Sequence, residues 1–232
     1  MKELKNIKIL VAKEDHIKYV DDINDAIDTA SKQRGTGIAR RTFEYLSTKM
    51  REGKAIIALD GDKFAGFCYI EEWQEKGFVA NSGLIVVDEY RGIGLAKAIK
   101  NKAFNLSRER YPNAKIFGLT TGLAVMKINH ELGYRPVTFS ELTVDDQFWN
   151  GCKGCVNYDI LTRTGRSKCL CTGMLYDPAW EKAKTVEAPI KKRSLLDIIQ
   201  ILKPIKSGLK ANKIKLEEKN QRVIGRIFNA LF

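Results

Sequence analysis

Residues 83–96 read Gly-Leu-Ile-Val-Val-Asp-Glu-Tyr-Arg-Gly-Ile-Gly-Leu-Ala, and this stretch decides the fold. Its first half contains a short run of aliphatic, largely β-branched residues, Leu84–Val87, which predicts a strand. Its second half, Arg91–Ala96, opens a helical pattern that ends near Arg110. The centre of the predicted fold is therefore a strand that turns into a helix through a glycine-rich segment.

The glycines of this turn favour the binding of a phosphate group. A helix N-terminus leaves backbone N–H groups without intrahelical partners, and the helix dipole adds positive potential there. Gly92 and Gly94 carry no side chain, so a diphosphate can approach the backbone closely. The simpler alternative is an ordinary strand-turn-helix unit whose glycines serve packing.

The spacing within the turn also matches a known pattern. Arg91, Gly94 and Ala96 fill the fixed positions of Arg/Gln-x-x-Gly-x-Gly/Ala, and this resembles the signature of the GNAT superfamily of acyl-CoA N-acyltransferases. Downstream, the tripeptide at 132–134, Leu-Gly-Tyr, resembles the Leu-Gly-Phe/Tyr that closes a later helix of the GNAT fold. The resemblance covers roughly residues 6–145 and implies an α+β fold with helices around a mixed central sheet.

The periodicity of the chain agrees with this fold, because the predicted elements follow the order β-α-α-β-β-β-α-β-α-β. Strands are predicted at residues 6–11, 55–59, 64–71, 78–87, 115–119 and 137–142. Helices are predicted at residues 15–32, 42–51, about 91–110, and 123–132. Since the composition changes from Phe148, three parts are expected: an acetyltransferase domain at 1–147, a cysteine-containing extension at 148–180 and a basic amphipathic helical tail at 181–232.

The positive charge is concentrated in the tail. The formal net charge is +12 at pH 7, and residues 181–232 hold a balance of +8. The main domain is therefore not expected to bind nucleic acid. The tail suits an anionic membrane surface or a partner's groove, while packing onto the domain and a homodimer contact are alternatives. No run reaches the roughly 18 apolar residues of a membrane span, and a cytoplasmic protein is expected.

The family resemblance implies acetyl-CoA as co-substrate. In that family the pantetheine arm pairs with the strand before the glycine turn, and the diphosphate rests on the turn itself. The cofactor-binding residues carried over in this way are Leu84, Ile85, Val86 and Val87 on the strand, and Arg91, Gly92, Ile93, Gly94, Leu95 and Ala96 on the turn and helix.

The acid–base residues depart from the family pattern. Many GNAT enzymes carry a tyrosine, which protonates the departing thiolate, where this chain has Asn129 beside His130. A glutamate that is often present on the central strand is replaced by Asn81, which we place among the substrate contacts. Strand alternation points only one of Glu71 and Glu72 into the cleft, and we predict Glu72 as the base; a solvated pair is the alternative.

The loop between the first two helices is the predicted acceptor site. GNAT enzymes usually bind the acceptor there, and Arg34 and Arg40 flank glycines at 35 and 37 that would let the loop close over a ligand. Arginine is suited to a carboxylate because its guanidinium binds both oxygens. The two arginines are otherwise ordinary charges at helix ends.

Four of the five cysteines lie within twenty residues. The paired spacing of Cys152, Cys155, Cys169 and Cys171 suits a tetrahedral zinc ion, and a reducing compartment argues against disulfides. Buried structural cysteines are the alternative. The fifth, Cys68, lies in a predicted strand and is expected in the core.

A longer stretch resembles one bacterial GNAT subgroup. Residues 116–134, Ser140–Thr143, the pair Phe148-Trp149 and the cysteines carry this resemblance. Members are associated with arginine-biosynthesis genes and regarded as N-acetylglutamate synthases, which implies glutamate as acceptor. Two other functions stay open: an N-acyltransferase for another small amine or a protein amine, and a non-enzymatic regulatory protein that binds acyl-CoA.

Overall fold

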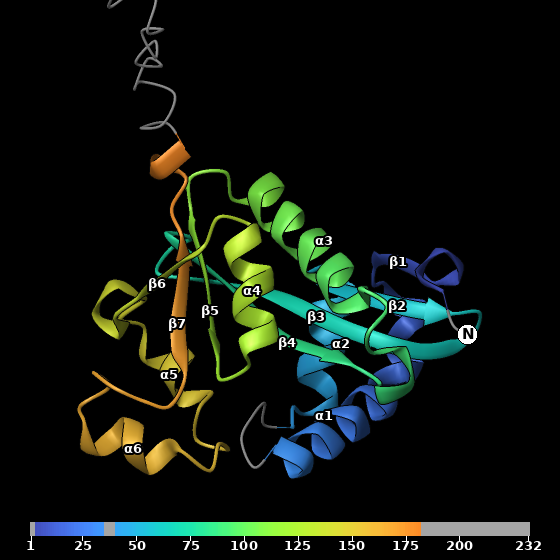
Figure 1. Cartoon of the computed structure of the whole chain (residues 1–232), viewed down its shortest axis with the longest axis horizontal. Helices are drawn as coiled ribbons and strands as arrows, with labels where there is room; N and C mark the ends of the chain where they lie inside the picture. The colour runs from blue at the N-terminus through green and yellow to red at the C-terminus, as the bar shows by residue number, and fades with distance from the viewer. Residues whose placement is uncertain (1–2, 35–39, 182–232) are drawn as a thin grey trace, which may run out of the picture. The chain divides into compact units, whose positions relative to one another are not determined.

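The computed structural model describes residues 3–34 and 40–181, and Arg34 by its backbone alone. In these residues seven strands form one sheet in the order β1-β2-β3-β4-β5-β7-β6 (Figure 1). Neighbouring strands are antiparallel except β4 and β5, which are parallel. The mixed sheet and its flanking helices confirm the predicted α+β class. The strands are β1 (Lys8–Val11), β2 (Ala55–Asp60), β3 (Lys63–Trp73), β4 (Phe78–Val86), β5 (Lys115–Thr120), β6 (Arg135–Val137) and β7 (Thr172–Tyr176).

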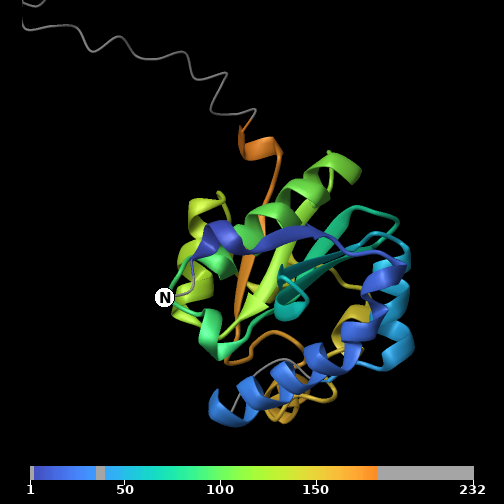
Figure 2. The ribbon, with the colours of Figure 1, turned by 90° about the vertical axis from the view of Figure 1, so that its right-hand side faces the viewer.

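Helices cover both faces of this sheet (Figure 2). On one face, Phe67 and Tyr69 of β3 pack in a core cluster with α1 and α2. On the other, Cys68 and Ile70 pack with α3, as the period of two along a strand requires. The helices are α1 (Val20–Arg34), α2 (Phe43–Arg51), α3 (Leu95–Arg110), α4 (Leu123–Glu131), α5 (Asp146–Asn150) and α6 (Tyr158–Arg163), with 3-10 turns η1 (Leu4–Asn6), η2 (Glu14–Tyr19), η3 (Asp88–Tyr90) and η4 (Phe139–Glu141).

Most predicted elements are confirmed to within a few residues. The helix predicted at 15–32 begins as the 3-10 turn η2 and continues as α1. Gly133 follows α4 with a φ of +89°, the left-handed conformation of a helix C-cap. None of the helices in the described part of the chain is long and apolar enough to cross a membrane.

The end of the sheet differs from the prediction. The strand expected at 137–142 stops at Val137, because Thr138 and Glu141 form a capping box that turns the chain into η4. The remaining strand is β7, which comes from the cysteine-containing extension and lies between β5 and β6. The sheet thus runs across the boundary expected at residue 147. From residue 182 onward, the predicted tail lies outside the described residues.

Two irregularities of β4 open the sheet. Phe67 pairs with Ile85 and Tyr69 with Ser82, so two β4 residues, at positions 83 and 84, oppose one residue of β3. Gly83 has a φ of +67°, and a Cβ there would lie 2.5 Å from Tyr69 Cε1. On its other edge β4 pairs with β5 only over residues 78–80. A bulge and an early end to pairing therefore separate β4 from β5.

Candidate active site

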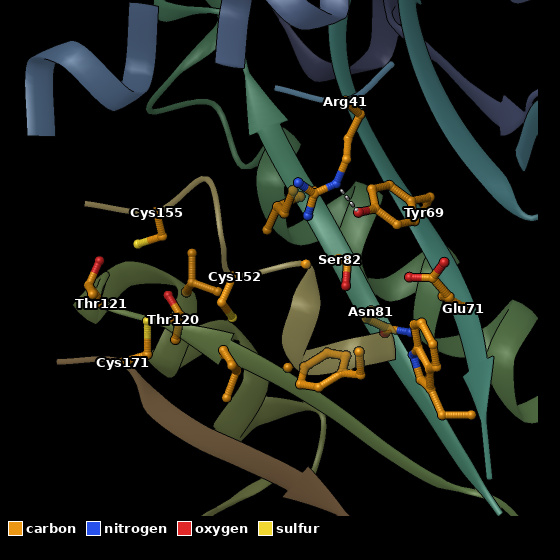
Figure 3. Close-up of a pocket in the computed structure, with 18 of the residues that line it drawn as sticks. Arg41, Tyr69, Glu71, Asn81, Ser82, Thr120, Thr121, Cys152, Cys155 and Cys171 are labelled. Atoms are coloured by element: carbon orange, nitrogen blue, oxygen red, sulfur yellow. Dashed lines mark hydrogen bonds between the residues drawn. The ribbon is translucent and has the colours of Figure 1, made fainter. Parts of the chain in front are cut away.

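A pocket lies where β4 leaves β5 (Figure 3). Residues 81–84 of β4 and 118–121 at the end of β5 form its sides, and its cavity volume of about 370 Å³ suits a small ligand. Side chains from β3, from Arg41 and α2, from α3 and α4, and from the cysteine-containing extension complete the lining. The pocket thus occupies the gap that opens between β4 and β5 beside the bulge in β4.

Arg41 is the cation on the α1–α2 side of this pocket. Its Nε donates a hydrogen bond to the Tyr69 hydroxyl at 3.2 Å, which Figure 3 shows, and its guanidinium carbon lies 5.9 Å from the centre of the Tyr45 ring. Asn24 of α1 fixes the Arg41 backbone through two hydrogen bonds, at 2.9 and 3.1 Å. Burial lowers the pKa of Arg41, but Tyr69 and the other neighbours outweigh this and raise it. Arg41 therefore stays charged and in place.

Glu71 lies on the same wall. Tyr45 donates to Glu71 Oε1 at 2.6 Å, and the Lys49 ammonium lies 2.8 Å from the same oxygen. Burial, together with Tyr69 and Glu71, raises the pKa of Tyr45 well above its usual value, so Tyr45 stays a hydrogen-bond donor. The pocket wall therefore presents both a carboxylate and the Arg41 guanidinium, and the negative charge of Glu71 contributes to the raised pKa of Arg41.

The choice of Glu72 as the residue facing the cleft was wrong. Odd-numbered positions of β3, such as Tyr69 and Glu71, face the pocket, whereas Glu72 faces the α3 side and does not line it. There Glu72 forms an ion pair with Lys54 at 2.6 Å. Burial raises the pKa of Glu72, but the hydrogen bond and charge of Lys54, a backbone hydrogen bond and the charge of Lys49 together outweigh it and leave the pKa lowered. Alternation was correctly applied, but the sequence does not show which parity faces the pocket.

The predicted substrate contacts are placed differently from one another. Arg40 is exposed, forms ion pairs with Asp25 and Asp28 of α1, and does not line the pocket. Arg34 ends α1, and its side chain is outside the described residues. Asn81 does line the pocket, but its side chain is held by Ser107 and Tyr134. The arginine that lines the pocket is thus Arg41, the sequence neighbour of Arg40, which was predicted to bind the substrate.

The strand residues predicted to hold a pantetheine arm divide between wall and core. Leu84 lines the pocket. Ile85 is buried against α1 and α2, whereas Val86 and Val87 pack in the α3 cluster. Ile85, Val86 and Val87 can therefore offer a ligand only their backbone groups. Backbone hydrogen bonding is what we expect if a pantetheine arm pairs along the strand.

The glycine turn has the geometry that an anion cradle needs. Gly92 and Gly94 have φ values of +82° and +86°, and a Cβ at either would meet nothing closer than 4.0 Å, so space for a ligand lies over the backbone. Arg91 fixes the turn by pairing with Asp88 at 2.7 Å and donating to the Val86 carbonyl at 3.3 Å. Leu95 is buried, and Ile93 and Ala96 pack against the same core. The residues present therefore fit a diphosphate at the start of α3.

Asn129 and His130 lie on different sides of α4. Asn129 is 1% exposed and lines the pocket, and its Oδ1 has no hydrogen-bond partner within the described residues. His130 is exposed and does not line the pocket. An amide cannot act as a general acid, so Asn129 can contribute a polar contact but not a proton.

The structure does not support the zinc ion expected from the cysteine spacing. Cys152, Cys155 and Cys171 line the pocket, and Cys152, Cys169 and Cys171 all pack against the neighbouring core cluster with its aromatic side chains. Nowhere in residues 3–34 and 40–181 do three His, Cys, Asp or Glu side chains form a group that could hold a metal. Burial, with the other thiols, raises the pKa of Cys152 to about 11 and that of Cys171 to about 12. With no metal ion beside them, Cys152 and Cys171 therefore favour the thiol form, and both line the pocket wall.

Sequence reasoning also missed Lys100. This lysine is 2% exposed and lines the pocket from α3. It falls on the same helical stripe as the buried residues Phe104 and Ser107, and a lysine on such a stripe is the signal that could have identified it.

Comparison with known proteins identifies the domain. Residues 23–131 match the profile of the Acetyltransferase (GNAT) family. Residues 23–131 therefore form an acetyltransferase domain of the GNAT family. The comparison with curated proteins gave no match.

Solved structures share the fold at low identity. N-acetylglutamate synthase of Neisseria gonorrhoeae, in complex with coenzyme A and N-acetylglutamate, has a TM-score of 0.54 and 16% identity, over 74% of this chain and 35% of that one. A Mycobacterium tuberculosis protein in complex with CoA has a TM-score of 0.53 and 14% identity, over 73% of this chain and 98% of that one. The protein yncA of Salmonella typhimurium, solved with its cofactor acetyl-CoA, has a TM-score of 0.51 and 12% identity, over 74% of this chain and 94% of that one. This chain thus spans about a third of the Neisseria protein.

Proposed function

We propose that this acyltransferase moves the acetyl group of acetyl-CoA to the α-amine of a small amino acid, with glutamate as the acceptor. The observation that carries the proposal is Arg41, whose guanidinium points into the pocket beside Tyr69. A guanidinium held there suits a carboxylate, because it can bind both oxygens. Glutamate is chosen because residues 116–134 resemble the arginine-biosynthesis subgroup.

The same wall suits the amine of an amino acid. The negative charge of Glu71 favours an arriving ammonium group, and Tyr45 and Lys49 hold the carboxylate in position. With its carboxylate at Arg41, the substrate would present its amine to the gap between β4 and β5. The amine must lose a proton before it attacks, and holding both reactants in one pocket supplies much of the rate enhancement.

The strand edge and the glycine turn suit the other substrate. Acetyl-CoA supplies an acetyl group already activated as a thioester. We place its pantetheine arm along β4 beyond Ala80, where pairing with β5 has ended. Its diphosphate would lie at Gly92 and Gly94, on the N–H groups that precede the Ala98-to-Gly94 hydrogen bond of α3. This arrangement carries the acetyl group along β4 into the pocket.

A thiol-release assay tests the proposal. Acetyl-CoA is supplied with glutamate, aspartate, glutamine, a polyamine and a lysine peptide in turn, and we expect the highest kcat/KM for glutamate. Loss of a hydrogen bond to a charged group costs about 1.5–3 kcal/mol, so Arg41→Gln should lower that value by about ten- to a hundredfold. Arg41→Lys should restore part of the loss, since lysine cannot bind both oxygens.

Arg40→Gln is the matched control. It removes the neighbouring charge, which is exposed and paired with Asp25 and Asp28, and should leave turnover nearly unchanged. Normal kcat/KM in Arg41→Gln would exclude the carboxylate role. Tight acetyl-CoA binding without turnover of any amine would favour the regulatory acyl-CoA-binding protein instead.

A further inference from the structure

Lys100 is a buried lysine without a buried counter-charge. It lies near the middle of α3 with 2% of its surface exposed, and none of the ion pairs in the described residues includes it. Its Nζ lies 3.5 Å from the Asn81 carbonyl oxygen and 5.4 Å from the centre of the Tyr134 ring. An ammonium group in such surroundings is unfavourable, and an aliphatic residue would fill the position at lower cost.

Among the buried titratable groups around Lys100, only Lys100 itself changes its charge near neutral pH. Cys68 of β3 and Tyr134 before β6 are the titratable residues that face it, and the contact from β4 is the Asn81 carbonyl. Burial raises the pKa of Cys68 to about 11 and that of Tyr134 well above its usual value, so both stay neutral at ordinary pH. Burial lowers the pKa of Lys100 to about 8, and Cys68 opposes this only in part.

The position of Lys100 is at the floor of the gap between β4 and β5. A Cβ at Gly118 of β5 would lie 3.3 Å from the Asn81 carbonyl oxygen and 3.9 Å from Lys100 Nζ. A glycine therefore keeps the space beside the ammonium open. Asn129, whose Oδ1 lacks a partner in the described part of the chain, lines the same space from α4. A ligand atom in the gap would meet these two polar groups.

We propose that Lys100 is the general acid that protonates the sulfur of coenzyme A as it leaves. The proposal rests on the acetyl transfer proposed above. The acceptor nitrogen forms a bond to the acetyl carbon, the carbon–sulfur bond breaks, and its electron pair stays on sulfur. Sulfur takes a proton from Lys100 Nζ, and the acceptor nitrogen gives one to solvent. Lys100 then regains a proton from solvent water, so atoms and charge balance over one turnover.

A general acid must be protonated to act, which fixes the expected pH dependence. In the wild-type protein kcat should fall as pH rises through the pKa of Lys100, near 8. Lys100→Met removes the acid while keeping a long aliphatic side chain for packing. It should lower kcat by about 10²- to 10⁴-fold and abolish the alkaline fall, while the KM for acetyl-CoA changes little.

The experiment compares pH profiles of kcat for the wild type, Lys100→Met and Lys102→Met. Lys102 lies on the same helix, is partly exposed and does not line the pocket, so its variant should retain the wild-type profile. A kcat of Lys100→Met within about threefold of wild type, or a wild-type profile flat to pH 10, overturns the proposal. If Lys100→Met does not fold, the wild-type profile decides alone.

Mass spectrometry of the wild-type protein after incubation with acetyl-CoA gives a second readout. A proton donor leaves Lys100 unmodified through many turnovers. Stoichiometric acetylation of Lys100 would instead show that it is an acceptor and would overturn the proposal. If the wild-type protein turns over no amine at all, the proposed function fails and the role of Lys100 fails with it. If the protein turns over an amine and Lys100→Met does not change that turnover, only the proposed role of Lys100 is overturned.

Discussion

The Tyr134 hydroxyl donates a hydrogen bond to Asn81 Oδ1 at 3.0 Å, and this bond ties the segment after α4 to the strand that opens the pocket. The Asn81 amide nitrogen in turn donates to Ser107 Oγ of α3 at 2.8 Å. All three side chains are buried. The network fixes β4 at Asn81, one residue past the end of its pairing with β5, and so fixes the width of the gap.

Tyr134→Phe tests the importance of this bond. The change leaves Asn81 Oδ1 buried and without its donor, which costs about 1–3 kcal/mol. We expect the free energy of unfolding to fall by that amount in urea titrations. Tyr158→Phe, at a residue that packs beside the extension's core, is the comparison. Equal stability of Tyr134→Phe and wild type would show that the hydroxyl does not hold the strand.

Gly94→Asp should abolish acetyl-CoA binding. The new carboxylate would repel the diphosphate, and any side chain would occupy the open space over the backbone. Gly94→Ala introduces the same strain at a φ of +86° without the charge, and should weaken binding less. Isothermal calorimetry measures both affinities. Wild-type affinity in a folded Gly94→Asp variant would place the diphosphate elsewhere.

Glu71 and Glu72 should respond differently to the same substitution. Glu71→Gln removes the negative charge on the pocket wall and should raise the KM for the amine by about tenfold. Glu72→Gln weakens the ion pair with Lys54 on the opposite face, and should leave the kinetic constants near wild type. Steady-state kinetics at saturating acetyl-CoA measure both effects. A larger rise in the KM for the amine in Glu72→Gln than in Glu71→Gln would show that Glu72, and not Glu71, faces the substrate.

Lys100 should also make stability depend on pH. Its pKa is lowered in the folded state, so between about pH 8 and the usual lysine value the unfolded chain binds more protons than the folded one. Stability contributed by this residue therefore rises with pH across that window, by about 1.4 kcal/mol for each unit of pKa depression. The advantage of Lys100→Met over wild type in thermal unfolding should be larger at pH 7 than at pH 10. A constant difference would contradict the lowered pKa.

The sequence predicted the elements of the fold well because their signals are local. The glycines at 92 and 94 adopt the left-handed conformations that the turn needs, and the aliphatic run before them forms the end of β4. The last strand could not be found in this way. β7 pairs with β5 across about fifty residues of intervening chain, and its sequence, Thr-Gly-Met-Leu-Tyr, carries no alternation that identifies a partner.

The site was predicted less completely because it depends on orientation. The sequence singled out Arg34 and Arg40 as carboxylate-binding residues, but it is Arg41 that faces the pocket, while Arg40 is paired at the surface. The choice between Glu71 and Glu72 depends on which face of β3 receives α2. A zinc ion was inferred from cysteine spacing, which says nothing about how far apart the thiols lie.

The place of β7 has a consequence for the growing chain on the ribosome. β5 forms one side of the pocket, yet its second neighbour is a strand that ends at Tyr176. Three cysteines of the pocket lining also lie beyond residue 150. The nascent acetyltransferase would therefore emerge with its glycine turn made and one edge of β5 bare. The pocket can close only once Tyr176 has left the exit tunnel, so its completion comes after the synthesis of β5 and of the glycine turn.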